Sequence, residues 1–149
     1  MTRRNRHRAQ SKPKSDPDLY SPQTSTDRIR SFAYAVSGCT YMLRHQKNTR
    51  IILVSSVFIV SVAMWLDLEA IHWAMLILAI GGVWVAEFIN AAIEATVNLL
   101  ESDMHPMAKV AKDVAAAAVL ITVFVAVLIG LLILGPAVVD RLNANATTS

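Results

Sequence analysis

The sequence predicts an all-α membrane protein with three transmembrane helices and an N-terminal amphipathic helix at the membrane surface. Two observations predict this class. The 149-residue chain is 54% hydrophobic and only 17% charged, and its apolar residues are concentrated in three runs without Asp, Glu, Lys or Arg, at 51–66, 70–86 and 114–139. A helix of about 20 residues crosses a hydrocarbon core of about 30 Å, so each run is a candidate span. A secreted or cytosolic globular domain is excluded.

The sequence also lacks the signatures of other classes. Cys39 is the single cysteine, which excludes an internal disulfide and a cysteine-based zinc or iron–sulfur site. The five glycines do not have the spacing of a Walker A loop or of a GxGxxG turn.

Basic residues are concentrated at one end of the chain and predict its orientation. Residues 1–50 hold 11 of the 14 Lys and Arg residues. The loop after the first run holds the acidic residues Asp67 and Glu69 and no basic residue. The loop before the third run holds Lys109 and Lys112. Because basic loops stay on the cytoplasmic side, we predict a cytoplasmic N-terminus and an external C-terminus. The net charge of +3 then reflects membrane topology, and we expect no nucleic-acid partner.

The segments outside the apolar runs differ in character. Residues 1–26 are rich in Arg, Lys, Ser, Thr and Pro, and we expect a disordered basic cytoplasmic tail. Residues 27–47 carry apolar side chains at helical spacing among basic ones, which predicts an amphipathic helix on the inner membrane surface. The predicted organisation is a membrane domain over residues 27–141 and a polar tail at 142–149, with spans at 50–67, 70–100 and 106–139.

Four polar residues share one face of the second span. They are two carboxylates and two amides: Glu87, Asn90, Glu94 and Asn98. Their spacings of three, four and four residues, at 100° per residue, confine them to a sector about 80° wide. A carboxylate in or near hydrocarbon costs several kcal/mol unless it is paired, hydrated or bound to a metal. A polar seam between helices would also use such residues, but two carboxylates on one seam repel each other, so we favour a functional role.

The depth of Glu87 favours chemistry at the inner interface. Glu87 lies 17 residues after Ala70, about 25 Å along the helix and close to the cytoplasmic edge of the hydrocarbon core. A carboxylate there can reach a lipid hydroxyl from one side and a water-soluble reagent from the other. A carboxylate in a proton pathway is expected nearer the midplane.

The start of the third helix offers a phosphate site. Pro106 is suited to the first helical position, and Lys109, Lys112 and Asp113 share one face of the turns that follow. Lys112 provides a cation for phosphate, and the helix start adds free N–H groups and a positive dipole. Taken alone, a surface ion pair would explain the Lys–Asp pair equally well.

These residues carry a family resemblance. EFINAAIEATVN (87–98), HPMAKVAKDVAAAAVLI (105–121) and WLDLEAI (65–71) resemble the small bacterial membrane lipid kinases, the diacylglycerol kinase and undecaprenol kinase family. The resemblance covers residues 28–135. It implies a homotrimer of three-span chains in the bacterial inner membrane that uses ATP and Mg²⁺ to phosphorylate a membrane lipid alcohol.

The resemblance also implies residue roles. Glu87 is the implied general base, and Glu94 with Gln46 the implied metal ligands. The implied nucleotide-binding residues are Tyr34, Gln46, Glu94, Asp103, His105, Lys112 and Asp113. The implied lipid-binding residues are Glu87, Asn90, Asn98 and Trp65. Gln46 stands where the family usually has Glu, and Asn98 where it usually has Asp.

Several readings remain open from the sequence. Undecaprenol and diacylglycerol both present a primary hydroxyl at the headgroup layer. The segments EFINAAIEA and HPMAKVAKD favour undecaprenol slightly as the substrate. A small proton-coupled transporter would also place carboxylates in a span, but it does not need the HPMAKVAKD segment. A non-catalytic subunit of a membrane assembly is the third reading, and Gln46 makes it more credible.

Overall fold

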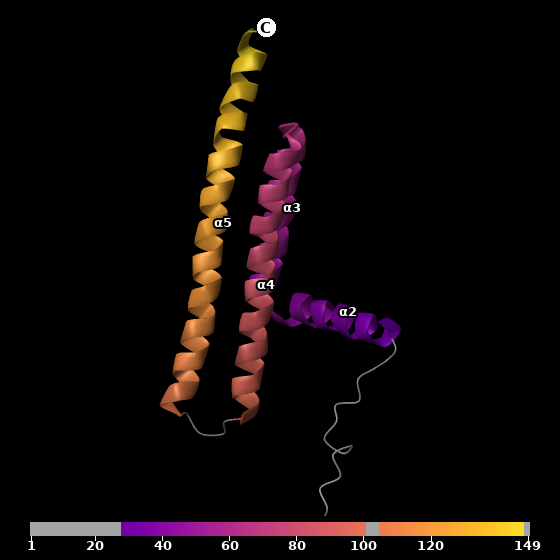
Figure 1. Cartoon of the computed structure of the whole chain (residues 1–149), viewed down its shortest axis with the longest axis vertical. Helices are drawn as coiled ribbons and strands as arrows, with labels where there is room; N and C mark the ends of the chain where they lie inside the picture. Colours follow the sequence, from indigo (N-terminus) through magenta and orange to yellow (C-terminus); the bar gives the residue numbers. More distant parts are fainter. Residues whose placement is uncertain (1–27, 101–104, 148–149) are drawn as a thin grey trace, which may run out of the picture. The chain divides into compact units, whose positions relative to one another are not determined.

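The structure is a computed structural model that describes residues 28–100 and 105–147, and these residues form four α-helices without a strand. The helices are α2 (Arg28–His45), α3 (Lys47–Trp65), α4 (Ala70–Leu100) and α5 (Pro106–Thr147) (Figure 1). Within the described residues, three stretches are long and apolar enough to span a membrane: Lys47–Trp65, Ala70–Leu99 and Pro106–Ala146. The predicted all-α membrane class is confirmed.

The chain divides into two units, residues 1–38 and 39–149, and α2 crosses the boundary between them. In the first unit the apolar side chains of Phe32 and Val36 are exposed, as in a helix with an apolar face for a membrane surface. The predicted tail at 1–26 and the predicted nucleotide contact Asp103 lie outside the described residues.

Helix α3 begins at Lys47, three residues before the predicted span. Gln46 separates it from α2 because its backbone is extended, with φ −103° and ψ 121°. The Arg50 side chain stabilises this corner: its Nε donates to the Leu43 carbonyl at 2.8 Å, and its Nη2 donates to the Arg44 carbonyl. Arg50 therefore binds carbonyls that the end of α2 leaves without intrahelical partners.

Helices α3 and α4 form an antiparallel hairpin through a short turn. The Leu66 N–H still donates to the Val62 carbonyl at 3.0 Å, and Asp67 then adopts a φ of 54°. Asp tolerates this left-handed conformation better than most residues, which explains an acidic residue at the turn.

Helix α5 is longer than the sequence predicts. The predicted span ends at residue 139 and a polar tail follows from 142, but the helix continues to Thr147. Residues 137–147 contain no Gly or Pro, so nothing in this stretch breaks the helical hydrogen bonding. Pro136 lies within the helix.

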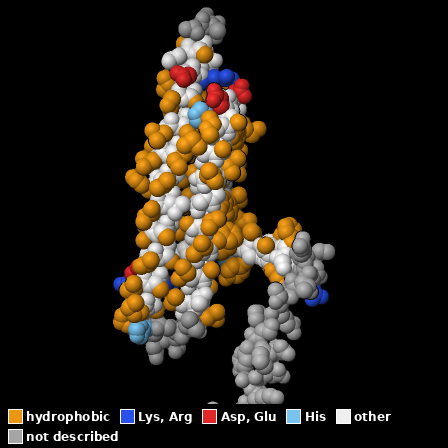
Figure 2. All heavy atoms as spheres, in the orientation of Figure 1, with side chains coloured by type: hydrophobic (Ala, Val, Ile, Leu, Met, Phe, Trp, Pro, Cys, Tyr) orange, Lys and Arg blue, Asp and Glu red, His pale blue; other side chains and the backbone are white. Residues whose placement is uncertain are grey.

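Helices α3, α4 and α5 pack around a small apolar core. Its buried members, one from each helix, are Ala63, Leu76 and Ile133. Most apolar side chains of the three helices are exposed instead, and Figure 2 shows them as a broad apolar surface with charged side chains gathered towards the ends. A protein that buries its apolar surface in lipid has this distribution.

A polar contact fixes α3 against α4. The Trp84 indole Nε1 donates to the Ser56 hydroxyl at 3.1 Å, and Ser56 donates to the Ile52 carbonyl at 2.7 Å. The Trp84 ring also contacts that of Phe88, with centroids 6.0 Å apart. Both polar groups of this contact are thus satisfied away from water, as an apolar environment requires.

Candidate functional site

The predicted polar face of the second span lies on one uninterrupted helix, α4. Burial decreases along it: Glu87 is 2% exposed and Asn90 is half-buried, whereas Glu94 and Asn98 are exposed. Glu94 follows Glu87 by seven residues, which is two turns along the same face of α4. One end of the face is therefore shielded from solvent, and the other is open to it.

Lys112 connects this face to the beginning of α5. Its Nζ donates to Oδ1 of Asn98 at 2.6 Å, although the two residues are 14 positions apart in the sequence. Lys112 is half-buried, and the neighbouring Asp113 is exposed. The structure thus joins two predicted site residues that come from different motifs.

His105 forms the N-terminal cap of α5. Its Nδ1 accepts a hydrogen bond from the Met107 N–H at 3.2 Å, and its carbonyl accepts from the Ala108 N–H at 3.0 Å. The cap holds the first turn of α5, two turns before Lys112, in a fixed conformation. In addition to its predicted nucleotide contact, His105 therefore has a structural role at this end.

The remaining predicted site residues lie elsewhere. Gln46 is half-buried at the corner between α2 and α3, and its side chain does not cap α3. Tyr34 belongs to the first unit, where its side chain is 69% exposed. Trp65, the last residue of α3, is 51% exposed and lies beside the turn that leads into α4. Since Glu87 is 17 residues, or about 25 Å, into α4, the chain does not bring Trp65 to the polar face.

Sequence reasoning missed Thr49, the other fully buried polar side chain among the described residues. It lies in the first turn of α3. Thr49, Ser56 and Ala63 follow each other at seven-residue intervals on α3, and this spacing is the signal that could have assigned all three to the face towards α4.

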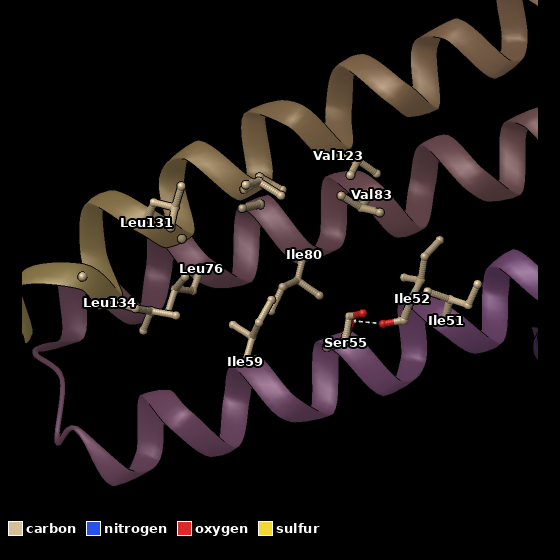
Figure 3. A pocket seen from close by; sticks show the side chains of 16 residues that line it. Ile51, Ile52, Ser55, Ile59, Leu76, Ile80, Val83, Val123, Leu131 and Leu134 are labelled. Carbon is tan, nitrogen blue, oxygen red and sulfur yellow. Dashed lines mark hydrogen bonds between the residues drawn. The ribbon is translucent and has the colours of Figure 1, made fainter. Parts of the chain in front are cut away.

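An apolar cavity of about 430 Å³ lies between α3, α4 and α5. Figure 3 shows Ile52 and Ile59 of α3, Val83 of α4 and Val123 of α5 among its lining residues. Val83 precedes Glu87 by one helical turn on α4, so the cavity ends close to the buried carboxylate.

The comparison with known families decides the class of this protein. The family model described as "Prokaryotic diacylglycerol kinase" matches residues 33–134. The chain belongs to this family. The prokaryotic diacylglycerol kinase family comprises membrane lipid kinases, so the chain is an ATP-dependent lipid kinase, and neither the transporter nor the non-catalytic subunit is favoured.

Individual relatives agree with the family match. The chain is 36% identical over 108 residues to the undecaprenol kinase of Bacillus subtilis (strain 168), covering 72% of this chain and 88% of that one. It is 38% identical over 109 residues to the diacylglycerol kinase of Synechocystis sp., covering 72% and 62%. It is 41% identical over 75 residues to the diacylglycerol kinase of Escherichia coli (strain K12), covering 50% and 62%.

The described residues contain no group of three His, Cys, Asp or Glu side chains placed to hold a metal ion. A kinase of this family generally needs a divalent cation for phosphoryl transfer. Mg²⁺ is usually bound by one or two carboxylates together with water and substrate phosphates. The donor chemistry of Glu94 and Gln46 fits such a nucleotide-bound cation better than a resident metal centre.

Proposed function

We propose that the protein transfers the γ-phosphate of ATP to the hydroxyl of a membrane lipid alcohol, for lipid recycling in envelope or phospholipid metabolism. The observation that carries this proposal is the gradient along one face of α4, from the buried Glu87 to the exposed Asn98 bound by Lys112. A lipid hydroxyl approaches from the apolar side and a nucleotide from the aqueous side. The buried end of the polar face therefore suits the lipid hydroxyl, and the exposed end suits the nucleotide.

Glu87 is the proposed general base. Its carboxylate accepts the proton of the lipid hydroxyl while the hydroxyl oxygen attacks the γ-phosphorus and the bond from that phosphorus to the ADP oxygen breaks. Because phosphoryl transfer requires little covalent chemistry from the protein, positioning and charge stabilisation supply most of the catalysis. Asn90, half-buried one turn after Glu87, is proposed to contact the lipid headgroup.

The nucleotide is proposed to bind at the α4–α5 end. Lys112 supplies a cation for phosphate, and the bond to Asn98 holds its ammonium at this place. Asp113 and the residues of the connecting segment, Asp103 and His105, complete the proposed nucleotide contacts, to which Tyr34 is added from α2. Trp65 stays a prediction as a lipid contact.

Glu94 and Gln46 are the proposed ligands of Mg²⁺ on ATP. The cation, when bound, neutralises charge on the phosphates during transfer. Glu94 is exposed and can present its carboxylate to a nucleotide-bound cation. Gln46 offers a neutral carbonyl oxygen, which is a weaker ligand for a hard cation than a carboxylate.

We favour undecaprenol over diacylglycerol as the lipid. The segments EFINAAIEA and HPMAKVAKD favour undecaprenol slightly, and the undecaprenol kinase of Bacillus subtilis is a relative whose length the chain covers to 88%. Both lipids present a primary hydroxyl at the headgroup layer, so the same base serves either one.

The proposed setting is a homotrimer in the bacterial inner membrane, with the N-terminus in the cytoplasm and the C-terminus outside. The basic residues before position 51 support the orientation. The large exposed apolar surface of α3, α4 and α5 supports both lipid contact and self-association.

A direct assay tests the function. The purified protein in mixed micelles receives ATP labelled at the γ-phosphate together with undecaprenol or diacylglycerol. We expect label in a lipid phosphate, with higher kcat/KM for undecaprenol, and a rate of labelling about 10²–10⁴ lower with Glu87→Gln. Absence of any labelled lipid would refute the proposal, and proton uptake into vesicles containing the protein would then favour a transporter.

A further inference from the structure

Thr49 and Glu87 are the largest fully buried side chains among the described residues, and both are polar. Thr49 is 0% exposed and Glu87 is 2% exposed. Oγ1 of Thr49 and Oε2 of Glu87 are shielded, and neither forms a hydrogen bond with another residue that the structure describes. Since buried polar atoms are almost always hydrogen-bonded, each of these oxygens calls for a partner that the described residues do not supply.

Thr49 differs from four other helical hydroxyls for a local reason. Ser56, Ser61, Thr96 and Thr122 each donate to the carbonyl four residues earlier, at 2.7 to 2.8 Å. Thr49 is in the first turn of α3, so the residue four positions earlier, His45, belongs to α2. The usual intrahelical acceptor is missing there, and the Thr49 hydroxyl is available to a ligand.

Two contacts define how α3 and α4 are aligned. Ser56 accepts the hydrogen bond of Trp84, and Ala63 belongs to the same buried cluster as Leu76. The helices run in opposite directions, so the residue numbers of facing positions have a nearly constant sum. The pairs Ser56–Trp84 and Ala63–Leu76 give the same sum to within one residue.

The alignment places Thr49 near Glu87. Thr49 lies seven residues before Ser56, on the same face of α3, and therefore opposite residues 90–91 of α4. Glu87 is one turn from that level, which is about 5 Å along the axis. The remaining buried atom without a hydrogen bond to a described residue, Nδ1 of His72, lies at the opposite end of α4.

We propose that Thr49 and Glu87 hold the reacting hydroxyl of the lipid between them. In this arrangement the oxygen of the lipid hydroxyl lies within hydrogen-bond distance, about 2.8 Å, of both side-chain oxygens. The lipid hydroxyl donates its hydrogen to Oε2 of Glu87 and accepts a hydrogen bond from the Thr49 hydroxyl. This arrangement leaves one lone pair of the lipid oxygen to attack the γ-phosphorus. Thr49 is then a substrate-binding residue that orients the nucleophile.

The proposal rests on the lipid kinase function and adds Thr49 to the residues that contact the lipid hydroxyl. During transfer the lipid oxygen forms its bond to phosphorus, the bond between phosphorus and the ADP oxygen breaks, and the proton passes to Glu87. A water molecule can occupy the same position between turnovers, because it offers the same donor and acceptor.

The test compares Thr49→Val, which replaces the hydroxyl by a methyl group of similar size, with Thr49→Ser, which keeps it. Thr96→Val is the matched control, because the Thr96 hydroxyl donates to the Ala92 carbonyl of its own helix. We expect Thr49→Val to lower kcat/KM for the lipid about tenfold, the value of one lost hydrogen bond to the reacting group, with KM for ATP unchanged. Thr49→Ser and Thr96→Val should keep kcat/KM within about twofold of the wild type.

The thermal unfolding midpoint Tm in detergent provides a readout that does not need activity. A buried hydroxyl without a ligand destabilises the fold, so its replacement by valine would raise Tm. Wild-type kcat/KM together with a raised Tm in Thr49→Val would overturn the inference. If the valine variant does not accumulate in the membrane, Thr49→Ala is compared with Thr49→Ser. A wild type that phosphorylates no lipid refutes the proposed function itself, whereas an active wild type with an unaffected Thr49→Val refutes only the role of Thr49.

Discussion

The Lys112 ammonium donates a hydrogen bond of 2.6 Å to the side-chain carbonyl of Asn98, and this bond joins the last turns of α4 to the second turn of α5. An amide accepts the bond without neutralising the ammonium. Lys112 is thereby held in place while its full positive charge stays available to a phosphate group.

Asn98, which the family resemblance implies as a lipid contact, should therefore also act on nucleotide binding through Lys112. We expect Lys112→Met to raise KM for ATP about tenfold or more, since charge-assisted bonds contribute about 1.5–3 kcal/mol, and Asn98→Ala to raise it less. In the double variant, Asn98→Ala should not raise KM for ATP beyond the value measured for Lys112→Met alone. KM for ATP and for lipid in the four proteins measures this coupling. Additive effects would assign Asn98 a separate contact, and an increase confined to KM for lipid would identify Lys112 as a membrane anchor.

Removal of the base should affect chemistry rather than binding. Glu87→Gln keeps the size of the buried side chain, so we expect it to lower kcat by about 10²–10⁴. Nucleotide affinity should be unchanged, because Glu87 lies at the shielded end of the polar face. Steady-state kinetics and a direct measurement of ATP binding test this prediction, and wild-type turnover in the variant would exclude Glu87 as the base.

Gln46→Glu tests the metal ligand at the α2–α3 corner. A carboxylate binds a hard cation more strongly than an amide oxygen does, so we expect half-maximal activity at a lower Mg²⁺ concentration. A magnesium titration of both proteins at saturating ATP and lipid provides the measurement. Coincident titration curves would instead mean that the corner faces water, where a charge is screened within about 8–10 Å, and that Gln46 does not contact the metal.

The contact between Ser56 and Trp84 should stabilise the α3–α4 hairpin. Interhelical hydrogen bonds in membranes contribute about 0.6 kcal/mol on average, so Ser56→Ala should lower the free energy of unfolding in detergent by a similar amount. Ser61→Ala is the matched control, because the Ser61 hydroxyl donates only to the Val57 carbonyl of its own helix in the described contacts. Equal losses in both variants would show that the interhelical bond contributes nothing of its own.

The sequence alone determined the class and the polar face of α4 on which the candidate site is built. Glu87, Asn90, Glu94 and Asn98 lie on one face of α4 because the angle per residue of a helix is constant, and no other part of the chain is needed to predict it. Likewise, the long uncharged runs predicted the spans, since the thickness of a membrane sets their length. The end of α5 was less predictable, because a polar composition at residues 142–147 does not itself stop a helix.

Only the tertiary structure decided which residues of different helices lie together. Periodicity assigns a residue to a face of its own helix, but the alignment of two helices depends on the turn at Asp67 and on contacts such as that of Ser56 with Trp84. That alignment buries Thr49 at the level of the α4 polar face. The packing of α4 on α5 likewise brings Lys112 to Asn98 across 14 residues of sequence. These relationships depend on side-chain packing between helices, which the spacing of residues within a single helix does not determine.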